Sequence, residues 1–404
     1  MTDTGGMPPS ISVERLEFHT IVQPLRFAYG HAKATHRSVE AVLCVAVDRA
    51  GNYGLGEAVP RAYVSGESGA SVMADLRRLA PRLLAGTVSL ASLRANIAEL
   101  IRSWPGVFPS CALCALEGAT LDLLARQSRC PLYHLFRPGP VEVLRYTASL
   151  GFGSARSVAF KTRLYLAAGF RAFKAKVGDA EDVPRLALIR RLIGPSRPLF
   201  ADANGAWTKE EAVVKIEGLA ALGVWAMEEP LRTADPPPGA GGQLDREAVL
   251  DDSHYQACHW IRRRSALPLI ADESLISPAS LERLLGHQAF DIVNVRLSKC
   301  GGHFAGAYMV ERAAQQGLGY GFGAMVAESA VLANHGAHFG ACHPERLYIQ
   351  GYSHLALQAR AYSSGGARLR LGATVKLGDA PGLGLRLNRA ALSAISRAKE
   401  TITL

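Results

Sequence analysis

Apolar and polar positions alternate with period two through the first fifty residues. β-Branched and apolar residues occupy about every second position in ISVERLEFHTIVQPL (11–25) and again in SVEAVLCVAVDRAGN (38–52). This period predicts half-buried β-strands, and DRAGN (48–52) predicts a hairpin turn. The following stretch, GLGEAVPRAYVSGESG (54–69), is rich in glycine, proline and serine, which predicts a loop.

From about residue 70 the apolar residues recur at positions i, i+3 and i+4. This spacing predicts amphipathic helices near residues 71–86, 91–103 and 110–127. Strands followed by helices predict an α+β domain over residues 1–140. The third helix contains Cys111 and Cys114, whose place in the apolar repeat predicts a helix core rather than a metal site.

After about Tyr146, strand-like and helix-like stretches alternate, which is typical of a parallel sheet built from βαβ units. Eight such strands fit a closed (β/α) barrel, whose chemistry lies at the C-terminal ends of the strands. An open doubly wound sheet is the alternative, but the first strand–helix turn lacks the GxGxxG fingerprint. The predicted strands are 145–151, 172–178, 198–204, 224–230, 267–274, 291–297, 318–324 and 346–351, and helices are predicted at 183–194, 208–223, 278–287 and 306–319.

We expect the barrel domain to span residues 141–370 and the C-terminal tail, 371–404, to complete the first domain. Strand-like alternation returns in this tail, in GLGLRLNRAALSAI (382–395). One connection is longer than a normal strand–helix loop. Residues 233–264, which include the low-complexity stretch DPPPGAGG, predict an insertion after the fourth barrel strand.

Composition and charge narrow the class of protein. The chain of 404 residues is 49% hydrophobic, with a formal charge of +10 and a pI of about 9.4. Its basic residues are scattered over predicted helices, which favours a surface suited to an acidic small molecule over a nucleic-acid-binding protein. Seven widely spaced cysteines suit a reduced, cytoplasmic protein. No apolar run reaches the ~18–20 residues that span a membrane.

Acidic residues close three successive predicted strands. The strands end in Asp202, in the pair Glu228–Glu229 and in the pair Asp272–Glu273, and alternation turns only one residue of each pair inward. Adjacent barrel strands bring these carboxylates together, where like charges repel unless a cation neutralises them. Three hard oxygen ligands suit Mg²⁺, so we expect a magnesium site; helix-capping carboxylates are the alternative.

Two lysines, Lys174 and Lys176, lie two residues apart in FKAKVG (173–178), on the strand before Asp202. Period two turns both side chains to one face, toward the barrel mouth, and it turns Asn204 there too, where we expect this amide to contact substrate. Lysines that reach solvent from an edge strand are the alternative. A second ammonium group and a divalent cation both disfavour the charged form, so one lysine is expected to serve as a general base. Metal and base together can remove the weakly acidic proton α to a carboxylate.

These motifs, in this order and at roughly this spacing, resemble the muconate lactonising enzyme subgroup of the enolase superfamily. The resemblance covers almost the whole chain. It implies an α/β fold in which an N-terminal α+β capping domain covers a modified TIM barrel, (β/α)₇β, with Mg²⁺ at the site. The segments that carry it are FKAKVG, ADANGAW, MEEPL, ADES and VNVRLSKCGG, together with GLGEAVPRAYVSGES and CALEGATLDLLARQSRCPLYHLF in the first half.

The resemblance also implies roles for single residues. Lys176 would be the base, with Lys174 as its neighbour. The metal ligands would be Asp202, Glu228 and Asp272.

Two loops of the capping domain would close over the substrate and set its identity. They are residues 27–38, with Tyr29, and residues 60–68, with Tyr63. The substrate implied is a small carboxylate, and a homo-oligomer is usual among such proteins.

The sequence departs from the subgroup at the end of the sixth barrel strand. Members that use two bases carry a lysine there, whereas this chain has Arg296, followed three residues later by Lys299. An arginine stays protonated near neutral pH, so it serves as a fixed cation for a carboxylate or an enolate rather than as an ordinary base. We therefore expect one-base chemistry, as in a dehydratase, another lyase or a cycloisomerase. A racemase or epimerase of an amino-acid or dipeptide derivative is the alternative and needs a second base, for which Lys299 is a candidate.

Further candidates lie near the C-terminal end of the barrel. Glu328, in GAMVAES, is expected to bind substrate or orient a catalytic group, with a helix N-cap as the alternative. The histidines of ANHGAHFGACH resemble a metal box. Their spacing of three and five places them on different helix faces, which favours a structural role for His335, His338 and His343.

Overall fold

A computed structural model describes residues 10–31, 34–104, 106–234 and 244–404, and between residues 27 and 36 it describes the backbone alone. The first sheet is antiparallel and draws strands from both ends of the chain. Its order is β16-β1-β2-β3, and a further short strand, β4, pairs with the start of β1. The five strands are β1 (Ser10–His31), β2 (Ala34–Asp48), β3 (Tyr53–Ala58), β4 (Thr87–Ser89) and β16 (Ser396–Thr403).

Helices pack against this sheet at the positions that the apolar spacing predicted. The longest, α4, is buried over residues 110–125, because β2 and β3 cover one side of it and α10 and α11 of the barrel cover another. The helices beside the sheet are α1 (Ala62–Ser65), α2 (Gly69–Leu83), α3 (Leu90–Ser103) and α4 (Ser110–Gln127), and the two barrel helices that contact α4 are α10 (Leu297–Cys300) and α11 (Gly302–Gln315).

The expectation of a loop over residues 54–69 was wrong at its start, where strand β3 runs from Tyr53 to Ala58. The glycines that suggested a loop serve close packing instead. A Cβ at Gly54 would lie 2.1 Å from the carbonyl oxygen of Ala119, and one at Gly56 would lie 2.0 Å from that of Ala115. Glycine therefore lets the strand approach the backbone of α4, a tertiary requirement that the local sequence does not reveal.

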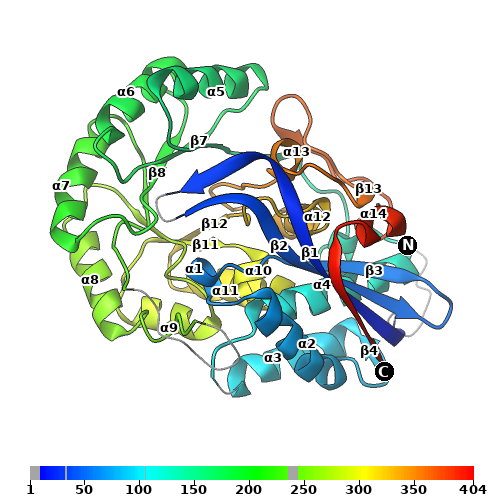
Figure 1. The fold of residues 1–404 in the computed structure, drawn as a ribbon. Coiled ribbons are helices and arrows are strands. Elements are labelled where there is room, and N and C mark those ends of the chain that lie inside the picture. Colours follow the sequence, from blue (N-terminus) through cyan, green and yellow to red (C-terminus); the bar gives the residue numbers. More distant parts are fainter. Residues whose placement is uncertain (1–9, 32–33, 105, 235–243) are drawn as a thin grey trace.

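The second sheet is parallel and curls into the barrel (Figure 1). The described residues place its strands in the order β12-β11-β10-β9-β8-β7-β6. Residues 346–351, predicted as the eighth strand, close the ring between β12 and β6 through backbone hydrogen bonds. The amide of Phe322 donates to the carbonyl of Tyr348 (3.0 Å), and the amide of Thr147 donates to that of Ile349 (2.9 Å). The strands are β6 (Ala148–Leu150), β7 (Phe173–Lys176), β8 (Leu199–Asp202), β9 (Met227–Glu228), β10 (Leu269–Ala271), β11 (Ile292–Val295) and β12 (Gly319–Phe322).

Helices surround these strands, and α5 to α9 form an outer arc in Figure 1. An inner parallel barrel under an antiparallel sheet with its own helices confirms the predicted α/β fold class. The helices of the arc are α5 (Ala155–Ala167), α6 (Asp182–Ile193), α7 (Lys209–Ala220), α8 (Asp252–Arg262) and α9 (Pro278–Gly286), and α12 (Ala330–Cys342) follows β12.

The predicted insertion at residues 233–264 is shorter than expected, because its second half forms the barrel helix α8. His254, Tyr255, Cys258 and Ile261 form the buried stripe of this helix. The stretch DPPPGAGG (235–242) lies outside the described residues. What remains as an inserted segment within the described chain is residues 244–251, which pack on the loop after α1, where the amide of Leu244 donates to the carbonyl of Gly66 (2.8 Å).

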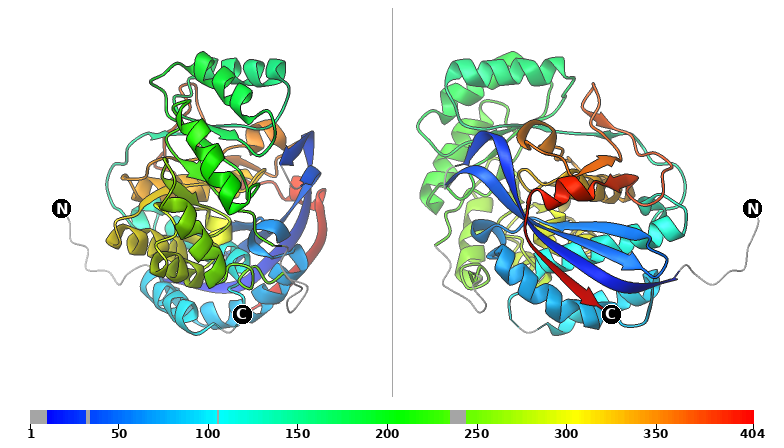
Figure 2. Two further views of the ribbon diagram at one scale, coloured as in Figure 1. Left: turned by 90° about the vertical axis from the view of Figure 1, so that its left-hand side faces the viewer. Right: turned by 45° about the vertical axis from the view of Figure 1, so that its right-hand side comes forward.

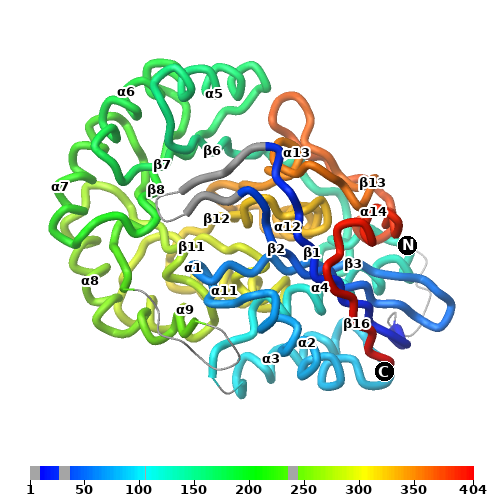
Figure 3. Tube along the Cα trace, in the orientation of Figure 1, coloured from blue at the N-terminus to red at the C-terminus, as the bar shows by residue number. Residues whose placement is uncertain are grey.

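The C-terminal residues return to the first sheet. Strand β16 runs antiparallel to β1, with Glu17 opposite Thr401, and the blue and red ends of the trace lie side by side in Figure 3. Figure 2 shows the same pairing from another direction. The remaining elements are η1 (Leu132–Leu135), β5 (Leu144–Arg145), α13 (His354–Leu357), β13 (Ser363–Gly365), β14 (Thr374–Val375), β15 (Leu385–Leu387) and α14 (Arg389–Ser393).

Within the part of the chain that the structure describes, no helix is both long enough and apolar enough to cross a membrane. The cysteines are free, and Cys111 and Cys114 lie buried inside α4 as predicted.

Candidate active site

The strand register sets the predicted site residues side by side at one end of the barrel. Lys176 of β7 lies opposite Asp202 of β8, and Asp202 lies opposite Glu228 of β9. Asp272 directly follows β10, whose Ile270 pairs with Glu228. The C-terminal ends of four neighbouring strands therefore carry two lysines and three carboxylates at a common mouth.

The lysines contact the first two carboxylates directly. The Nζ of Lys174 lies 2.7 Å from Oδ2 of Asp202 and 2.6 Å from Oε1 of Glu228. The Nζ of Lys176 lies 2.6 Å from the same oxygen of Asp202. The two ammonium groups thus point to one place, as the alternation in FKAKVG predicted.

The pKa of Lys174 shifts in the direction opposite to the one expected for a lysine beside a bound cation. Burial lowers the pKa of Lys174, but the carboxylates of Asp202 and Glu228 outweigh it and hold this pKa above the ordinary value of lysine. Burial raises the pKa of Asp202, whereas the two lysines lower it further, so this carboxyl titrates well below its usual range. The protein's own charges therefore favour the charged forms of Lys174 and Asp202.

Arg296 closes the other side of the carboxylate group. Its Nη2 contacts Oδ2 of Asp272 and lies 3.9 Å from Oε1 of Glu228. Gly323 leaves the space for it, because a Cβ there would lie 2.9 Å from Cγ of Arg296. Since β7 and β11 are separated by three strands, the lysines and the guanidinium flank the acids from opposite sides.

Lys299, the other basic candidate, is fully buried on α10. Its Nζ donates to the carbonyl oxygens of Asp272 (2.7 Å), Asn294 (3.2 Å) and Leu275. Burial lowers the pKa of Lys299, yet three carbonyl acceptors match the three N–H bonds of an ammonium group. This geometry favours a structural role for Lys299 over the catalytic role that the sequence left open.

Asn204 was expected to contact substrate, but its amide is already engaged within the protein. Its Oδ1 accepts from Lys176, and its Nδ2 donates to Oε1 of Glu273 (3.1 Å). The residue adopts a left-handed conformation (φ 47°). A hydrogen bond from its backbone amide to Oδ1 of Asp202 (2.8 Å) stabilises this conformation. Asn204 therefore positions Lys176.

Sequence reasoning missed the part played by Glu229. Strict alternation would turn it away from Glu228, yet both are buried, and Glu229 has a positive φ of 43°. Its carboxylate accepts from the amides of Asp272 (2.6 Å) and Ser274 (2.7 Å) and so fixes the loop after β10. The acidic pair in MEEP was the available signal.

Three further residues were predicted to contact substrate: Glu328, Tyr63 and Tyr29. Glu328 is buried, accepts from the amide of Met325 (3.0 Å) and lines a cavity of about 20 Å³ together with Gly323 and Gln350. Burial raises its pKa well above the ordinary value of glutamate. Tyr63 lies half-buried on α1 against the main core. The side chain of Tyr29 lies outside the described residues.

The histidines of α12 serve packing, as their spacing predicted. His335 donates through Nε2 to the carbonyl of Leu55 (2.8 Å) and accepts through Nδ1 from Nε2 of His303 (3.1 Å). The Nδ1 of His338 accepts from the amide of Tyr133 (3.2 Å). Burial lowers the pKa of His303, His335 and His338, so these neutral rings link the two domains. Burial also lowers the pKa of His343, whose ring packs against that of Phe339.

The donor set at the mouth fits a hard divalent cation. Oε2 of Glu228 is buried without a hydrogen-bond donor, whereas the oxygens of Asp272 lack a hydrogen bond but face cations, Oδ2 in an ion pair with Arg296 and Oδ1 3.4 Å from Nζ of Lys299. Such oxygens are unfavourable unless a cation or donor satisfies them. Among the described residues, no three acidic, histidine or cysteine side chains are close enough together to coordinate one metal ion. Lys174 and Arg296 lie between the carboxylates.

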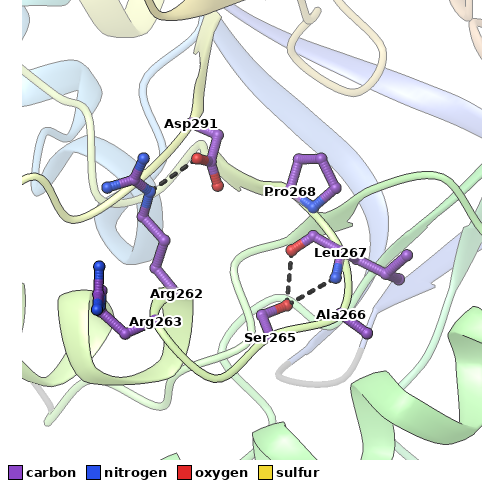
Figure 4. A pocket seen from close by; sticks show the side chains of 7 residues that line it. All are labelled: Arg262, Arg263, Ser265, Ala266, Leu267, Pro268 and Asp291. Carbon is purple, nitrogen blue, oxygen red and sulfur yellow. Dashed lines mark hydrogen bonds and ion pairs between the residues drawn. The ribbon is translucent and has the colours of Figure 1, made fainter.

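A much larger cavity, about 560 Å³, opens away from these residues (Figure 4). It lies where β10 and β11 begin, at the opposite end of the barrel, and Arg262 there is paired with Asp291 (2.7 Å). The carboxyl ends of the strands carry barrel chemistry, so its size does not make it the candidate site.

Sequence comparison with known proteins finds one matching family and several relatives. The family model described as enolase C-terminal domain-like matches residues 157–239 and 247–391. An L-Ala-D/L-Glu epimerase of Bacillus subtilis is 27% identical, with 93% of this chain and 97% of the relative covered. A hydrophobic dipeptide epimerase of Citrifermentans bemidjiense is 29% identical (83% and 87% covered). A cis-3-hydroxy-L-proline dehydratase of Roseibium aggregatum is 28% identical over 61% of this chain and 60% of its own length.

Solved structures agree with the fold. A muconate lactonizing enzyme from Pseudomonas fluorescens, complexed with muconolactone, superposes with a TM-score of 0.82 at 22% identity, covering 96% of this chain and all of its own. A dipeptide epimerase from Cytophaga hutchinsonii, complexed with Mg and the dipeptide D-Ala-L-Val, superposes with a TM-score of 0.79 at 22% identity, covering 97% of this chain and all of its own.

Proposed function

Because the chain belongs to the enolase superfamily, among the proteins similar to mandelate racemase and muconate lactonising enzyme, we propose that it is a Mg²⁺-dependent enzyme that removes the proton α to a carboxylate. One observation carries this proposal: two lysines and three strand-end carboxylates converge at the barrel mouth, with Lys174 within 2.7 Å of two of the acids. The related epimerases and dehydratase are named for dipeptides and a hydroxyproline. The proposed substrate is therefore a carboxylate derived from an amino acid.

Asp202, Glu228 and Asp272 would hold the Mg²⁺ ion, as the buried Oε2 of Glu228, which has no hydrogen-bond partner in the described residues, supports. When bound, the ion would supply positive charge to stabilise the negative charge that develops on the substrate carboxylate. The Mg and dipeptide in the neighbouring epimerase structure support the same pairing of ion and substrate class.

Lys176 is the proposed base. Its side chain is 12% exposed, whereas that of Lys174 is 4% exposed, so Lys176 is the more accessible of the two to a substrate in the mouth. Contacts with Asp202 and Asn204 orient its amine. Lys174, bonded to two carboxylates, keeps its proton and contributes charge.

Arg296 decides which reaction follows proton removal. It lies across the mouth from Lys176, so a substrate between them would meet a base on one face and a fixed cation on the other. A proton removed by Lys176 can return only from the same side unless a second base exists. We therefore propose one-base chemistry, a lyase or cycloisomerase reaction.

Epimerisation is the second candidate, and the relatives favour it. Epimerases match almost the whole chain, whereas the dehydratase matches 61% of it. Under this candidate Arg296 or another group would have to deliver a proton to the opposite face.

Incubation in D₂O separates the two candidates. Dipeptides and N-acyl amino acids of known configuration are incubated with enzyme and Mg²⁺, and the products are examined by NMR and chiral chromatography. One-base chemistry yields α-deuterated substrate of unchanged configuration, or an eliminated or cyclised product. Deuterium at the α-carbon of both stereoisomers would replace the lyase or cycloisomerase proposal by an epimerase.

A further inference from the structure

A layer of inward-facing side chains forms the floor beneath the carboxylates. Strand alternation places these residues one step below the site on neighbouring strands, and they pack as a cluster of their own. Four of them are plain hydrophobic residues. The exception is Tyr348, on the segment that closes the barrel between β12 and β6. The cluster comprises Phe200, Ala226, Ile270, Ile292 and Tyr348.

The barrel makes room for the Tyr348 ring in one position. Gly321 of the neighbouring β12 has no side chain where the ring lies, since a Cβ there would be 2.3 Å from ring carbons of Tyr348. On its other side the ring contacts that of Phe200, with centroids 4.8 Å apart. The Nζ of Lys174 lies 5.8 Å from the same Phe200 ring. Tyr348 is thus held directly under the lysine–carboxylate cluster.

The hydroxyl of Tyr348 is buried and has no hydrogen-bond partner within the described part of the chain. Charged groups that face it are Glu228, Arg296 and Asp202. Of these, Glu228 carries an equally buried oxygen, Oε2, that has no donor. A phenol donates one proton and a carboxylate oxygen accepts one, so the two unsatisfied atoms are complementary. Leaving both unpaired in an apolar floor is unfavourable.

We propose that Tyr348 is a positioning residue of the metal site, whose hydroxyl donates to the carboxylate of Glu228 when that carboxylate holds a divalent cation. This inference rests on the proposed function, because it assigns Glu228 as a metal ligand. Groups that hydrogen-bond to metal ligands fix their orientation and strengthen binding. Tyr348 reaches Glu228 from below and leaves the mouth free for substrate.

The simpler role for Tyr348 is to fill space under Lys174. Phenylalanine would fill that space equally well, so Tyr348→Phe separates the two roles. A matched control is Tyr320→Phe. Tyr320 lies next to Gly321 on β12 but faces the other way, against the rings of Phe322 and His343.

Metal affinity is measured without substrate, by titration calorimetry with Mg²⁺ and by electron paramagnetic resonance with Mn²⁺. Tyr348→Phe is expected to bind both ions about 10- to 100-fold more weakly than wild type, whereas Tyr320→Phe binds as wild type does. Equal affinity of Tyr348→Phe and wild type overturns the proposal, and so does an equal loss in both variants. If wild type itself binds neither ion, the proposed function fails instead.

Thermal melting in EDTA gives a second readout. With no cation present, the hydroxyl has nothing to orient, so Tyr348→Phe is expected to melt no lower than wild type. A lower melting temperature in EDTA would mean that the hydroxyl already has a partner in the metal-free protein, which contradicts the proposal.

Discussion

Replacing Lys299 by methionine removes a buried ammonium group while keeping an unbranched side chain of similar length. In the structure this ammonium holds three backbone carbonyls together, those of Asp272, Leu275 and Asn294. It also lies 3.4 Å from Oδ1 of Asp272. Methionine cannot donate to any of these oxygens, so the loop that carries Asp272 loses its internal anchor.

The expected loss of stability follows from those contacts. A hydrogen bond from a charged donor contributes about 1.5–3 kcal/mol net, and three such bonds are lost. Removing the ammonium also removes the unfavourable burial of its charge, which offsets part of this sum. The net loss should be about 3–5 kcal/mol, the range found when one partner of a buried charged group is deleted. Folded domains are stable by about 5–15 kcal/mol, so Lys299→Met should be severely weakened.

Urea unfolding followed by tryptophan fluorescence measures this loss. Lys161→Met is the control, because Lys161 is exposed on α5 and its replacement should change stability by no more than about 0.5 kcal/mol. If Lys299→Met unfolds at the urea concentration of wild type yet has lost turnover, the structural role is wrong. Lys299 would then be a chemical group, as the sequence alone allowed.

Further predictions concern both chemistry and stability. Lys176→Ala should abolish turnover and leave Mg²⁺ affinity near wild type; turnover that survives would mean that the base is misassigned. Arg296→Lys places an amine across the mouth from Lys176, so this variant should form product inverted at the α-carbon, as measured by chiral chromatography. A product of unchanged configuration argues against the role of Arg296. Burial raises the pKa of Glu17, but Arg389 and Lys399 outweigh this effect and lower the pKa to about 2, below the ordinary value of glutamate, 4.5. The stability that Glu17 contributes is thus present above pH 4.5 and lost as the pH falls toward 2. Because Arg389 and Lys399 are half-exposed, this contribution of Glu17 to the free energy of unfolding is about 1–2 kcal/mol. The difference in urea midpoint between wild type and Glu17→Gln should shrink between pH 5 and pH 2, and a constant difference would contradict this assignment.

Regular periodicity explains why the fold could be predicted from the sequence. Period two in FKAKVG turned Lys174 and Lys176 to one face, and the structure has both against Asp202. The helices α2, α3 and α4 lie within a few residues of their predicted positions, because their apolar stripes face a core. Parallel strands end at one edge, so acids at successive strand ends had to meet.

Tertiary contacts explain what the sequence did not reveal. Gly54 and Gly56 signalled a loop locally, but they serve the close approach of β3 to α4. The positive φ of Glu229 broke the alternation that would have excluded it from the site. The strand pattern around Tyr348 does not distinguish it from its neighbours. The absence of a side chain at Gly321 is what leaves room for its ring under the site.

The roles of single charged residues were the hardest to predict. A lysine three residues after Arg296 could equally face the mouth or the backbone, and only the carbonyls around Lys299 distinguish the two. Likewise Asn204 points to the mouth, but its amide is used by Lys176 and Glu273. Periodicity gives direction along an element, and partners come from distant parts of the chain.

The joint role of the divalent ion and Lys176 is tested most directly by the loss of an α-proton signal, followed by NMR in D₂O with dipeptides and N-acyl amino acids. We expect loss of this signal with wild type and Mg²⁺, and no loss when EDTA is added or when Lys176 is replaced by alanine. Exchange that continues in EDTA, or that Lys176→Ala carries out at the rate of wild type, would contradict the claim that a divalent ion and this lysine act together at the barrel mouth.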